Sequence, residues 1–166
     1  KSEYYIWHDP APDGGPPNNW ASVFGGSAWE FEPRRGQYYL HIFSKKQPDL
    51  NWACKALREE LLAMMDWWAQ RGVDGFRVDA ISYLEKPQGF PNSPLPPQPD
   101  GYSLFNNWAA GSEGTHRYIR MMHDRVFGPR GLVTVGEVSL NAPEEIASYV
   151  DPDRREFTMA IPFVPP

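Results

Sequence analysis

Two acidic side chains stand near the ends of two short apolar segments in this chain of 166 residues. Asp79 lies near the end of GVDGFRVDAI (residues 72–81), with Arg77 two positions before it, and Glu137 lies near the end of LVTVGEV (residues 132–138). Short apolar runs bounded by turn residues are typical of buried β-strands. Two carboxyl groups at the same end of parallel strands are the smallest set of catalytic groups that could cleave a glycosidic bond.

Segments with helical periodicity lie before, between and after these two strands in the sequence. One helix is predicted from about residue 51 to Gly72, with Asn51 as its N-terminal cap. The apolar residues that recur along it at helical spacing are assigned to the core: Leu57, Leu61, Met64, Met65 and Trp68. A second helix is predicted over residues 112–127, and a short third helix is predicted to begin at Asn141.

The order of the elements predicts an α/β fold with a parallel sheet. After residue 50 the chain alternates helix, strand, loop, helix, strand and helix, with a further strand over residues 157–163. Such alternation is typical of parallel strands joined by right-handed crossovers. The loop, residues 87–100, contains six prolines and is predicted to have no regular element. Residues 1–50 are rich in Trp, Tyr, Gly and Pro, and their best strand candidate is QYYLHIF (residues 37–43).

The predicted topology brings the two carboxyl groups together. Strands joined by a single crossover are usually neighbours, about 4.8 Å apart. Carboxyl groups roughly 5 Å apart suit a retaining glycosidase, whereas an inverting enzyme needs about 6.5–9.5 Å to admit a water molecule. Arg77, on the same strand face as Asp79, would keep that carboxyl ionised, as a nucleophile must be. Glu137 has no basic neighbour in its own strand, and this less polar setting suits a general acid.

The same residues allow other interpretations. Arg77 and Asp79 could form a buried ion pair without a function, and Glu137 could be a hydrogen-bonding residue at a strand end. Metal binding would need a third or fourth ligand nearby. The sequence has no DxDxDG loop, no HExxH motif and no ligand spacing among its four histidines, so we expect neither a metal nor another cofactor.

Composition and charge restrict the class of partner. Hydrophobic residues make up 41% and charged residues 22% of the chain, which is typical of a globular domain. Aromatic residues make up 14%, a content that fits both a Trp-rich core and a site that stacks sugars. A net charge of −5 without a basic run argues against nucleic acid and anionic membranes as partners, and no apolar stretch reaches the length of about 18 residues that spans a bilayer. We therefore expect a small neutral ligand, and the sequence does not indicate an oligomeric state.

The single cysteine and the start of the chain bear on location. Cys54 cannot form an internal disulfide and is compatible with a reducing compartment, so we expect a cytoplasmic protein. The sequence begins at Lys1 without an initiator Met or a signal peptide, and it therefore looks like an internal part of a longer protein. Secretion stays open because a targeting segment could precede Lys1.

Three ordered motifs along the chain resemble those of the α-amylase family of glycoside hydrolases, and in particular its α-glucosidase branch of oligo-1,6-glucosidases and maltases. GFRVDAI resembles the motif with the family's arginine and nucleophilic aspartate, and TVGEV resembles the motif with its general acid/base. SKKQPDLNW (residues 44–52) resembles a third motif, near the end of a domain inserted after the third barrel strand. PNNWASVFGGS (residues 17–27) and residues 37–43 are also similar to that inserted domain.

This resemblance implies part of a (β/α)8 TIM barrel. Residues 51–166 would be the central part of the barrel, about strands four to six with their helices, and residues 1–50 would be the end of the inserted, loop-rich domain. Asp79 would be the nucleophile and Glu137 the general acid/base. The residues implied in substrate binding are Arg77, Phe24, Phe43 and Gln47. For the two phenylalanines, packing inside the inserted domain is an equal alternative.

The activity implied by the resemblance is retaining hydrolysis of terminal α-glucosidic bonds in short oligosaccharides. In this branch, a small residue such as Ala80 after the nucleophile is associated with a preference for α-1,4 over α-1,6 bonds. The pair Ser82–Tyr83 departs from the Ser–His common there, which leaves the aglycone side open. Glucosyl transfer or isomerisation, of the sucrose isomerase or trehalose synthase type, uses the same carboxylates. A further alternative is a carbohydrate- or partner-binding module that has lost its chemistry.

Two motifs of the family are not found in these residues. The first would precede Lys1, and the last, with the third catalytic aspartate, would follow Pro166. A closed barrel of this kind needs about 250 residues. We therefore expect the 166 residues alone to have little or no activity.

Overall fold

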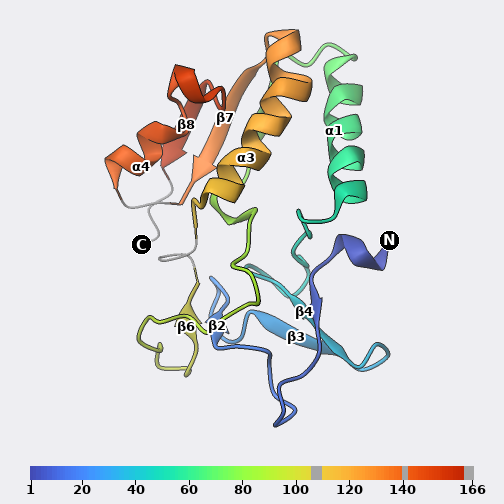
Figure 1. Cartoon of the computed structure of the whole chain (residues 1–166), viewed down its shortest axis with the longest axis vertical. Coiled ribbons are helices and arrows are strands. Elements are labelled where there is room, and N and C mark those ends of the chain that lie inside the picture. The colour runs from blue at the N-terminus through green and yellow to red at the C-terminus, as the bar shows by residue number, and fades with distance from the viewer. Residues whose placement is uncertain (106–109, 140–141, 163–166) are drawn as a thin grey trace. The chain divides into compact units, whose positions relative to one another are not determined.

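Two compact units make up the computed structural model, which describes residues 1–105, 110–139 and 142–162 (Figure 1). The first unit contains residues 1–54 together with residues 86–105, and the second contains the other described residues. The proline-rich loop therefore folds with the N-terminal residues, although its place in the sequence suggested that it belonged with the barrel strands. The division of the chain into domains at residue 50 stays a prediction.

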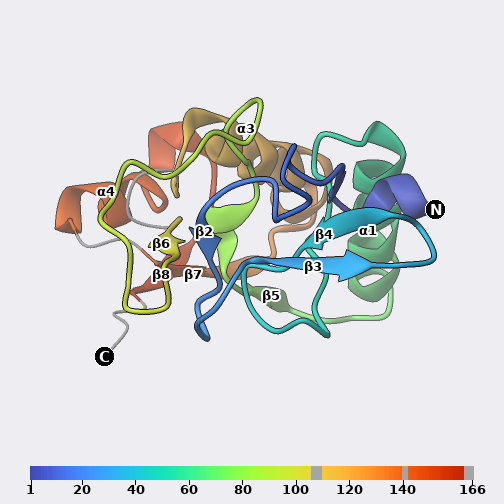
Figure 2. The ribbon, with the colours of Figure 1, turned by 90° about the horizontal axis from the view of Figure 1, so that it is seen from below.

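The first unit is built from short strands. Its antiparallel sheet has the order β1 (Trp7–His8), β4 (Gln37–Leu40) and β3 (Trp29–Glu32). The strands β3 and β4 form a hairpin and lie side by side in Figure 2. A separate parallel pair joins β2 (Trp20–Ala21) to β6 (Ser103–Leu104). The strand predicted over residues 37–43 is confirmed for its first four residues.

The proline-rich loop of the first unit lies against an aromatic core. Trp20 and Trp29 are almost fully buried, and the ring of Trp20 lies 4.3 Å from that of Phe105. The loop is attached to this core because the indole N–H of Trp20 donates a hydrogen bond of 2.9 Å to the Pro91 carbonyl. Residues 86–102 contain no helix or strand, which confirms the prediction from their prolines.

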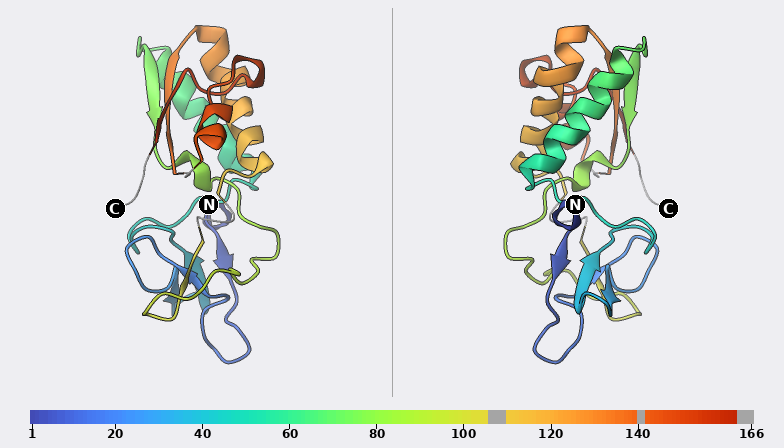
Figure 3. Two further views of the ribbon diagram at one scale, coloured as in Figure 1. Left: turned by 90° about the vertical axis from the view of Figure 1, so that its left-hand side faces the viewer. Right: turned by 90° about the vertical axis from the view of Figure 1, so that its right-hand side faces the viewer.

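The second unit is a parallel sheet with a helix before each strand. The strand order is β5 (Gly75–Val78), β7 (Val133–Val138) and β8 (Met159–Pro162). The helices that precede these strands are, in the same order, α1 (Lys55–Ala69), α3 (Glu113–Met122) and α4 (Pro143–Ser148). The predicted alternation, the parallel pairing and the adjacency of the first two strands are confirmed. Figure 3 shows α1 and α3 on one side of the sheet.

The two faces of this sheet differ in burial. Toward the helices, Thr134 and Val138 are buried, and Phe76 packs with its ring 5.7 Å from that of Phe127. Successive side chains of a strand alternate between faces, and paired residues of parallel strands share one. The opposite face therefore carries Arg77, Val133, Val135, Glu137, Met159 and Ile161. Its apolar members are open to solvent, since Ile161 is 50% exposed.

Helix α1 differs from its prediction in two respects. It begins at Lys55 rather than after Asn51, because the Asn51 side chain instead accepts a hydrogen bond of 3.2 Å from the Ala53 N–H and closes a turn ahead of the helix. The assignment of Met64 and Trp68 to the core is wrong, since both are nearly half exposed. The buried positions of α1 are Leu57, Leu62 and Met65, so Met64 and Trp68 lie at the edge of its buried face.

The remaining elements follow the sequence prediction closely. The helix predicted over residues 112–127 is α3 with Ser112 as its N-cap, continued by one π-helical turn, His123–Phe127. The predicted third helix is α4, and Asn141, its expected start, lies outside the described residues. The strand predicted at residues 157–163 is β8. Within the described ranges, no helix is long and apolar enough to cross a membrane.

Candidate active site

The structure brings Arg77, Asp79 and Glu137 together at the C-terminal ends of two neighbouring strands. Arg77 lies in β5, Asp79 is the first residue after β5, and Glu137 lies in β7. The parallel register pairs Val78 with Gly136, so the residues that follow each of these also lie side by side. The carboxyl ends of parallel strands are where functional sites of α/β folds form.

One guanidinium group bridges the two carboxylates. The Nη2 of Arg77 lies 2.8 Å from Oε1 of Glu137, and its Nη1 donates to Oδ1 of Asp79. The planar guanidinium presents several donors in a fixed arrangement, which allows one side chain to hold two acids at once. The sequence pattern missed the contact with Glu137, because Arg77 comes from the adjoining strand rather than from β7 itself.

The three side chains differ in exposure. Asp79 is 70% exposed and Arg77 is 50% exposed, whereas Glu137 is only 18% exposed. In the described chain, the ion pair between Arg77 and Asp79 is therefore exposed rather than buried. An exposed carboxylate that is held at the end of a strand is accessible to a ligand, while the carboxyl of Glu137 is largely shielded from water.

The backbone of Ala80 adds a second contact to Glu137. Its N–H donates a hydrogen bond of 3.2 Å to Oε2, so each carboxyl oxygen of Glu137 has its own donor. Ala80 adopts the left-handed conformation, with φ of 47°. Residues other than glycine rarely adopt this backbone conformation, which costs them about 1 kcal/mol or more and is often found beside functional sites. No feature of the sequence pattern indicates this donor, because the contact depends on a backbone conformation.

Phe24 and Phe43 lie together in the first unit. Their ring centroids are 6.2 Å apart at an angle of 65°, an edge-to-face contact. Phe24 is 72% exposed, so its ring is not packed into the core of this unit. Both residues are held through Ser22, whose hydroxyl donates to the Phe43 carbonyl at 2.8 Å and accepts from the Phe24 N–H at 3.2 Å. An exposed aromatic ring that packs against a second, partly exposed ring is a suitable surface for stacking a sugar.

Gln47, also in the first unit, lies in an exposed turn. Its side-chain oxygen accepts a hydrogen bond of 3.3 Å from the Ser44 backbone N–H, and the backbone N–H of Gln47 donates to the Ser44 carbonyl at 2.8 Å. The predicted site residues therefore form one cluster in each unit: Phe24 with Phe43 in the first, where Gln47 also lies, and Arg77 with both carboxylates in the second.

The carboxylates of the site have a positive partner in Arg77. Among the residues that the structure describes, no group of three or more His, Cys, Asp or Glu side chains is arranged to hold a metal ion. In the same unit, the phenol of Tyr149 is fully buried. Burial raises the pKa of Tyr149 to about 12, so this group stays neutral at ordinary pH.

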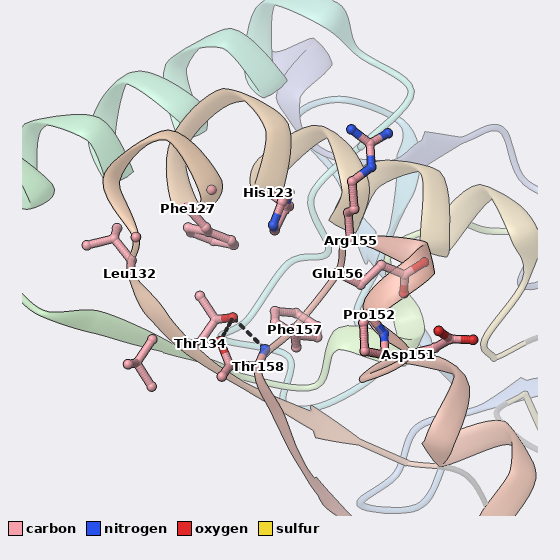
Figure 4. Close-up of a pocket in the computed structure, with 13 residues that line it drawn as sticks. His123, Phe127, Leu132, Thr134, Asp151, Pro152, Arg155, Glu156, Phe157 and Thr158 are labelled. Carbon is pink, nitrogen blue, oxygen red and sulfur yellow. Dashed lines mark hydrogen bonds between the residues drawn. The ribbon is translucent and has the colours of Figure 1, made fainter.

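A cavity of about 410 Å³ lies at the opposite end of β7 (Figure 4). Its floor includes Thr134 and Thr158, which are joined by hydrogen bonds of 3.0 and 3.1 Å, and the ring of Phe157. Neither Asp79 nor Glu137 lines this cavity. Because sites of parallel α/β folds form at the carboxyl ends of strands, we place the candidate site at the two acids instead.

Comparison with protein families identifies a match along almost the entire chain. The family described as "Alpha amylase, catalytic domain" matches residues 1–165. Among individual proteins, an oligo-1,6-glucosidase from Halalkalibacterium halodurans is 44% identical over 162 residues. The match covers 97% of this chain and 28% of that relative, so the chain spans little more than a quarter of the relative's length.

Solved structures give the same result. A trehalose-6-phosphate hydrolase from Bacillus licheniformis is 39% identical, with a TM-score of 0.86 over 95% of this chain and 27% of its own. A trehalulose synthase from Pseudomonas mesoacidophila MX-45 is 42% identical, with a TM-score of 0.84 over 97% of this chain and 28% of its own. At these identities the likeness extends beyond the fold to the sequence itself.

Proposed function

We infer the function from the family: this chain belongs to the alpha-amylase catalytic-domain family, and its second unit is part of a (β/α)8 barrel. We propose that the natural protein containing it hydrolyses terminal α-glucosidic bonds of short oligosaccharides with retention. Within that barrel, β5, β7 and β8 would be strands four to six. The first unit would contain the end of a domain inserted after the third strand.

In the proposed reaction the two acids divide the work. Asp79 attacks the anomeric carbon and forms a covalent glucosyl–enzyme ester, while Glu137 donates a proton to the departing glycosidic oxygen. Glu137 then removes a proton from water, which attacks the same carbon and releases glucose and free Asp79. Two successive inversions at one carbon leave the product with the anomeric configuration of the substrate.

The observation that carries this proposal is the Arg77 bridge between the carboxylates. Asp79 and Glu137 come from adjacent parallel strands, whose backbones lie about 4.8 Å apart. One guanidinium contacts both acids, which keeps them close enough for a double-displacement mechanism. Arg77 would also keep Asp79 oriented between turnovers.

The finer parts of the proposal concern the substrate. Phe24 and Phe43 would stack against a sugar ring, and the exposed amide of Gln47 would donate to a hydroxyl group of the sugar. Ala80, next to the nucleophile, would favour α-1,4 over α-1,6 bonds. The substrate is a neutral oligosaccharide, and the reaction needs no cofactor.

The proposal is tested with Asp79→Asn in the natural protein. An amide is a very poor nucleophile, so we expect kcat/KM for maltose to fall by about 10⁴-fold or more. Asp74→Asn, five residues earlier and exposed, is a matched control that should keep its activity. Proton NMR of the first product should show α-glucose. An Asp79→Asn protein that hydrolyses maltose at the wild-type rate would remove Asp79 from the mechanism.

Glucosyl transfer or isomerisation is the second candidate, because the chain resembles a trehalulose synthase as strongly as it resembles a hydrolase. Both reactions share the glucosyl–enzyme ester and differ in whether water or a sugar hydroxyl attacks it. Chromatography of the products from maltose and from sucrose separates them: glucose and fructose indicate hydrolysis, and isomeric disaccharides indicate transfer. No turnover of either sugar by the wild-type protein would favour a binding module without chemistry.

A further inference from the structure

Two hydrogen bonds join the segment that leaves β5 to the end of β7 and the residue after it, and both lie beside the candidate site. The first runs from the Ala80 N–H to Oε2 of Glu137, at 3.2 Å. The second runs from the Ser139 N–H to the hydroxyl oxygen of Ser82, at 3.1 Å. Ser82 is three residues after Asp79 and Ser139 is two residues after Glu137. The segment after Asp79 is therefore fastened both to the Glu137 side chain and to the segment after Glu137.

The Ser82 side of this contact is shielded from water. Ser82 is fully buried within a short 3₁₀ turn, Ile81–Tyr83, whose other two residues are also buried. Val138, between Glu137 and Ser139, is fully buried as well. Ser139 itself is partly exposed, but the hydroxyl that accepts from its N–H belongs to a buried turn. Removing that hydroxyl takes away the acceptor that fixes Ser139 against this turn.

Ser82 also fixes a third segment. Its carbonyl oxygen accepts a hydrogen bond of 3.0 Å from the Gly111 N–H, just ahead of helix α3. The turn that contains Ser82 is thus held by its backbone on one side and holds Ser139 by its side chain on the other. This arrangement makes the hydroxyl the link between a fixed turn and the end of β7.

We propose that Ser82 is a positioning residue of the candidate site: by holding the Ser139 N–H, its hydroxyl keeps the Glu137 carboxyl in place to protonate the leaving group opposite Asp79. The inference rests on the proposed function, since it assigns Ser82 to the acid step of that reaction. Ser82 itself touches neither the substrate nor the reacting atoms.

The acid step has a signature that a general loss of folding does not have. A sugar leaving group is a basic alkoxide and needs a proton from Glu137, whereas fluoride departs without one. Bond formation by Asp79 is common to both substrates. A displaced Glu137 therefore lowers kcat/KM for maltose but not for α-glucosyl fluoride, because kcat/KM reports the step that forms the ester.

The experiment compares these two substrates in the natural protein with Ser82→Ala. We expect kcat/KM for maltose to fall by about tenfold or more, a part of the 10²–10⁴ that general acids contribute, and kcat/KM for α-glucosyl fluoride to change by less than about threefold. Ser93→Ala is the matched control, because Ser93 is a buried serine of the first unit that also uses its hydroxyl in a hydrogen bond. Its substrate ratio should stay at the wild-type value.

The ratio of the two kcat/KM values does not depend on how much of the sample is folded. If Ser82→Ala yields too little protein, Ser82→Cys replaces the hydroxyl by a weaker acceptor of similar shape and should shift the ratio in the same direction. An unchanged ratio, which includes equal losses of kcat/KM on both substrates, would overturn the role of Ser82.

Two further variants separate this inference from the proposed function. Glu137→Gln should shift the substrate ratio more than Ser82→Ala does, and Asp79→Asn should abolish turnover of both substrates. If Glu137→Gln leaves the ratio unchanged, or if Asp79→Asn remains active, the proposed function fails. If both behave as expected and Ser82→Ala keeps the wild-type ratio, only the inference about Ser82 fails.

Discussion

At the scale of single residues, Arg77 organises the candidate site. It contacts the two acids through two different nitrogens, whereas an isolated ion pair would involve only one acid. Half of its side chain is exposed, so this network contributes little to stability, as is usual for solvent-accessible ion pairs. We infer that its value lies in orientation of the two carboxyl groups.

Arg77→Lys tests that role. A lysine keeps the positive charge but has one point of attachment, so it cannot hold Asp79 and Glu137 together. We expect kcat/KM for maltose to fall by about 10²-fold, the usual effect of a catalytic group displaced by about 1 Å, with little change in melting temperature. Arg117→Lys, an exposed arginine of helix α3, is the control. Full activity of Arg77→Lys would show that charge alone is sufficient.

The sequence was most informative where a residue type and its strand position coincide. Asp79, Glu137 and Arg77 could be grouped because charged residues on short apolar strands are costly without a partner or a ligand. The contacts of Ala80 and Ser82 could not be predicted, since one depends on a left-handed backbone and the other on a hydrogen bond between residues 57 positions apart. Their residue types are ordinary.

At the scale of elements, the alternation of helices and strands was predictable because its periodicities are strong. Helix α3 and strand β7 follow the prediction within one residue at their starts. The start of α1 was not predictable, because asparagine stabilises turns as readily as helix ends, and Asn51 closes a turn here. The return of residues 86–105 to the first unit could not be predicted either, since it depends on long-range contacts such as that of Trp20 with Pro91.

The packing of β7 against the segment before β8 gives a prediction at this scale. A Cβ atom added at Gly136 would lie 2.6 Å from the ring of Phe157, which is too close for two carbon atoms. We expect Gly136→Ala to lower the free energy of unfolding by about 1–3 kcal/mol, measured by urea denaturation of the natural protein.

Phe157→Leu is the matched partner for this test. The smaller side chain makes room for the added methyl group, so the double variant should be less destabilised than the sum of the two single variants. Additive losses would mean that the clash is relieved elsewhere and that Phe157 does not restrict β7.

At the scale of the whole molecule, the chain accounts for 28% of the length of the H. halodurans relative. One face of the β5–β7–β8 sheet carries Arg77 and Glu137, and its apolar residues Val133, Met159 and Ile161 are about half exposed. Faces of this kind are normally covered in a folded protein. We therefore expect the proposed activity only where the family's remaining strands close the barrel around this face.

The proposed mechanism requires a covalent ester between Asp79 and glucose. The most direct measurement is mass spectrometry of the natural protein after treatment with 5-fluoro-α-glucosyl fluoride, a substrate whose ester forms faster than it hydrolyses. We predict one added fluoroglucosyl group, located by peptide fragmentation on Asp79 and missing from Asp79→Asn. A label on another residue, or rapid turnover of the reagent without any covalent label, would contradict the account.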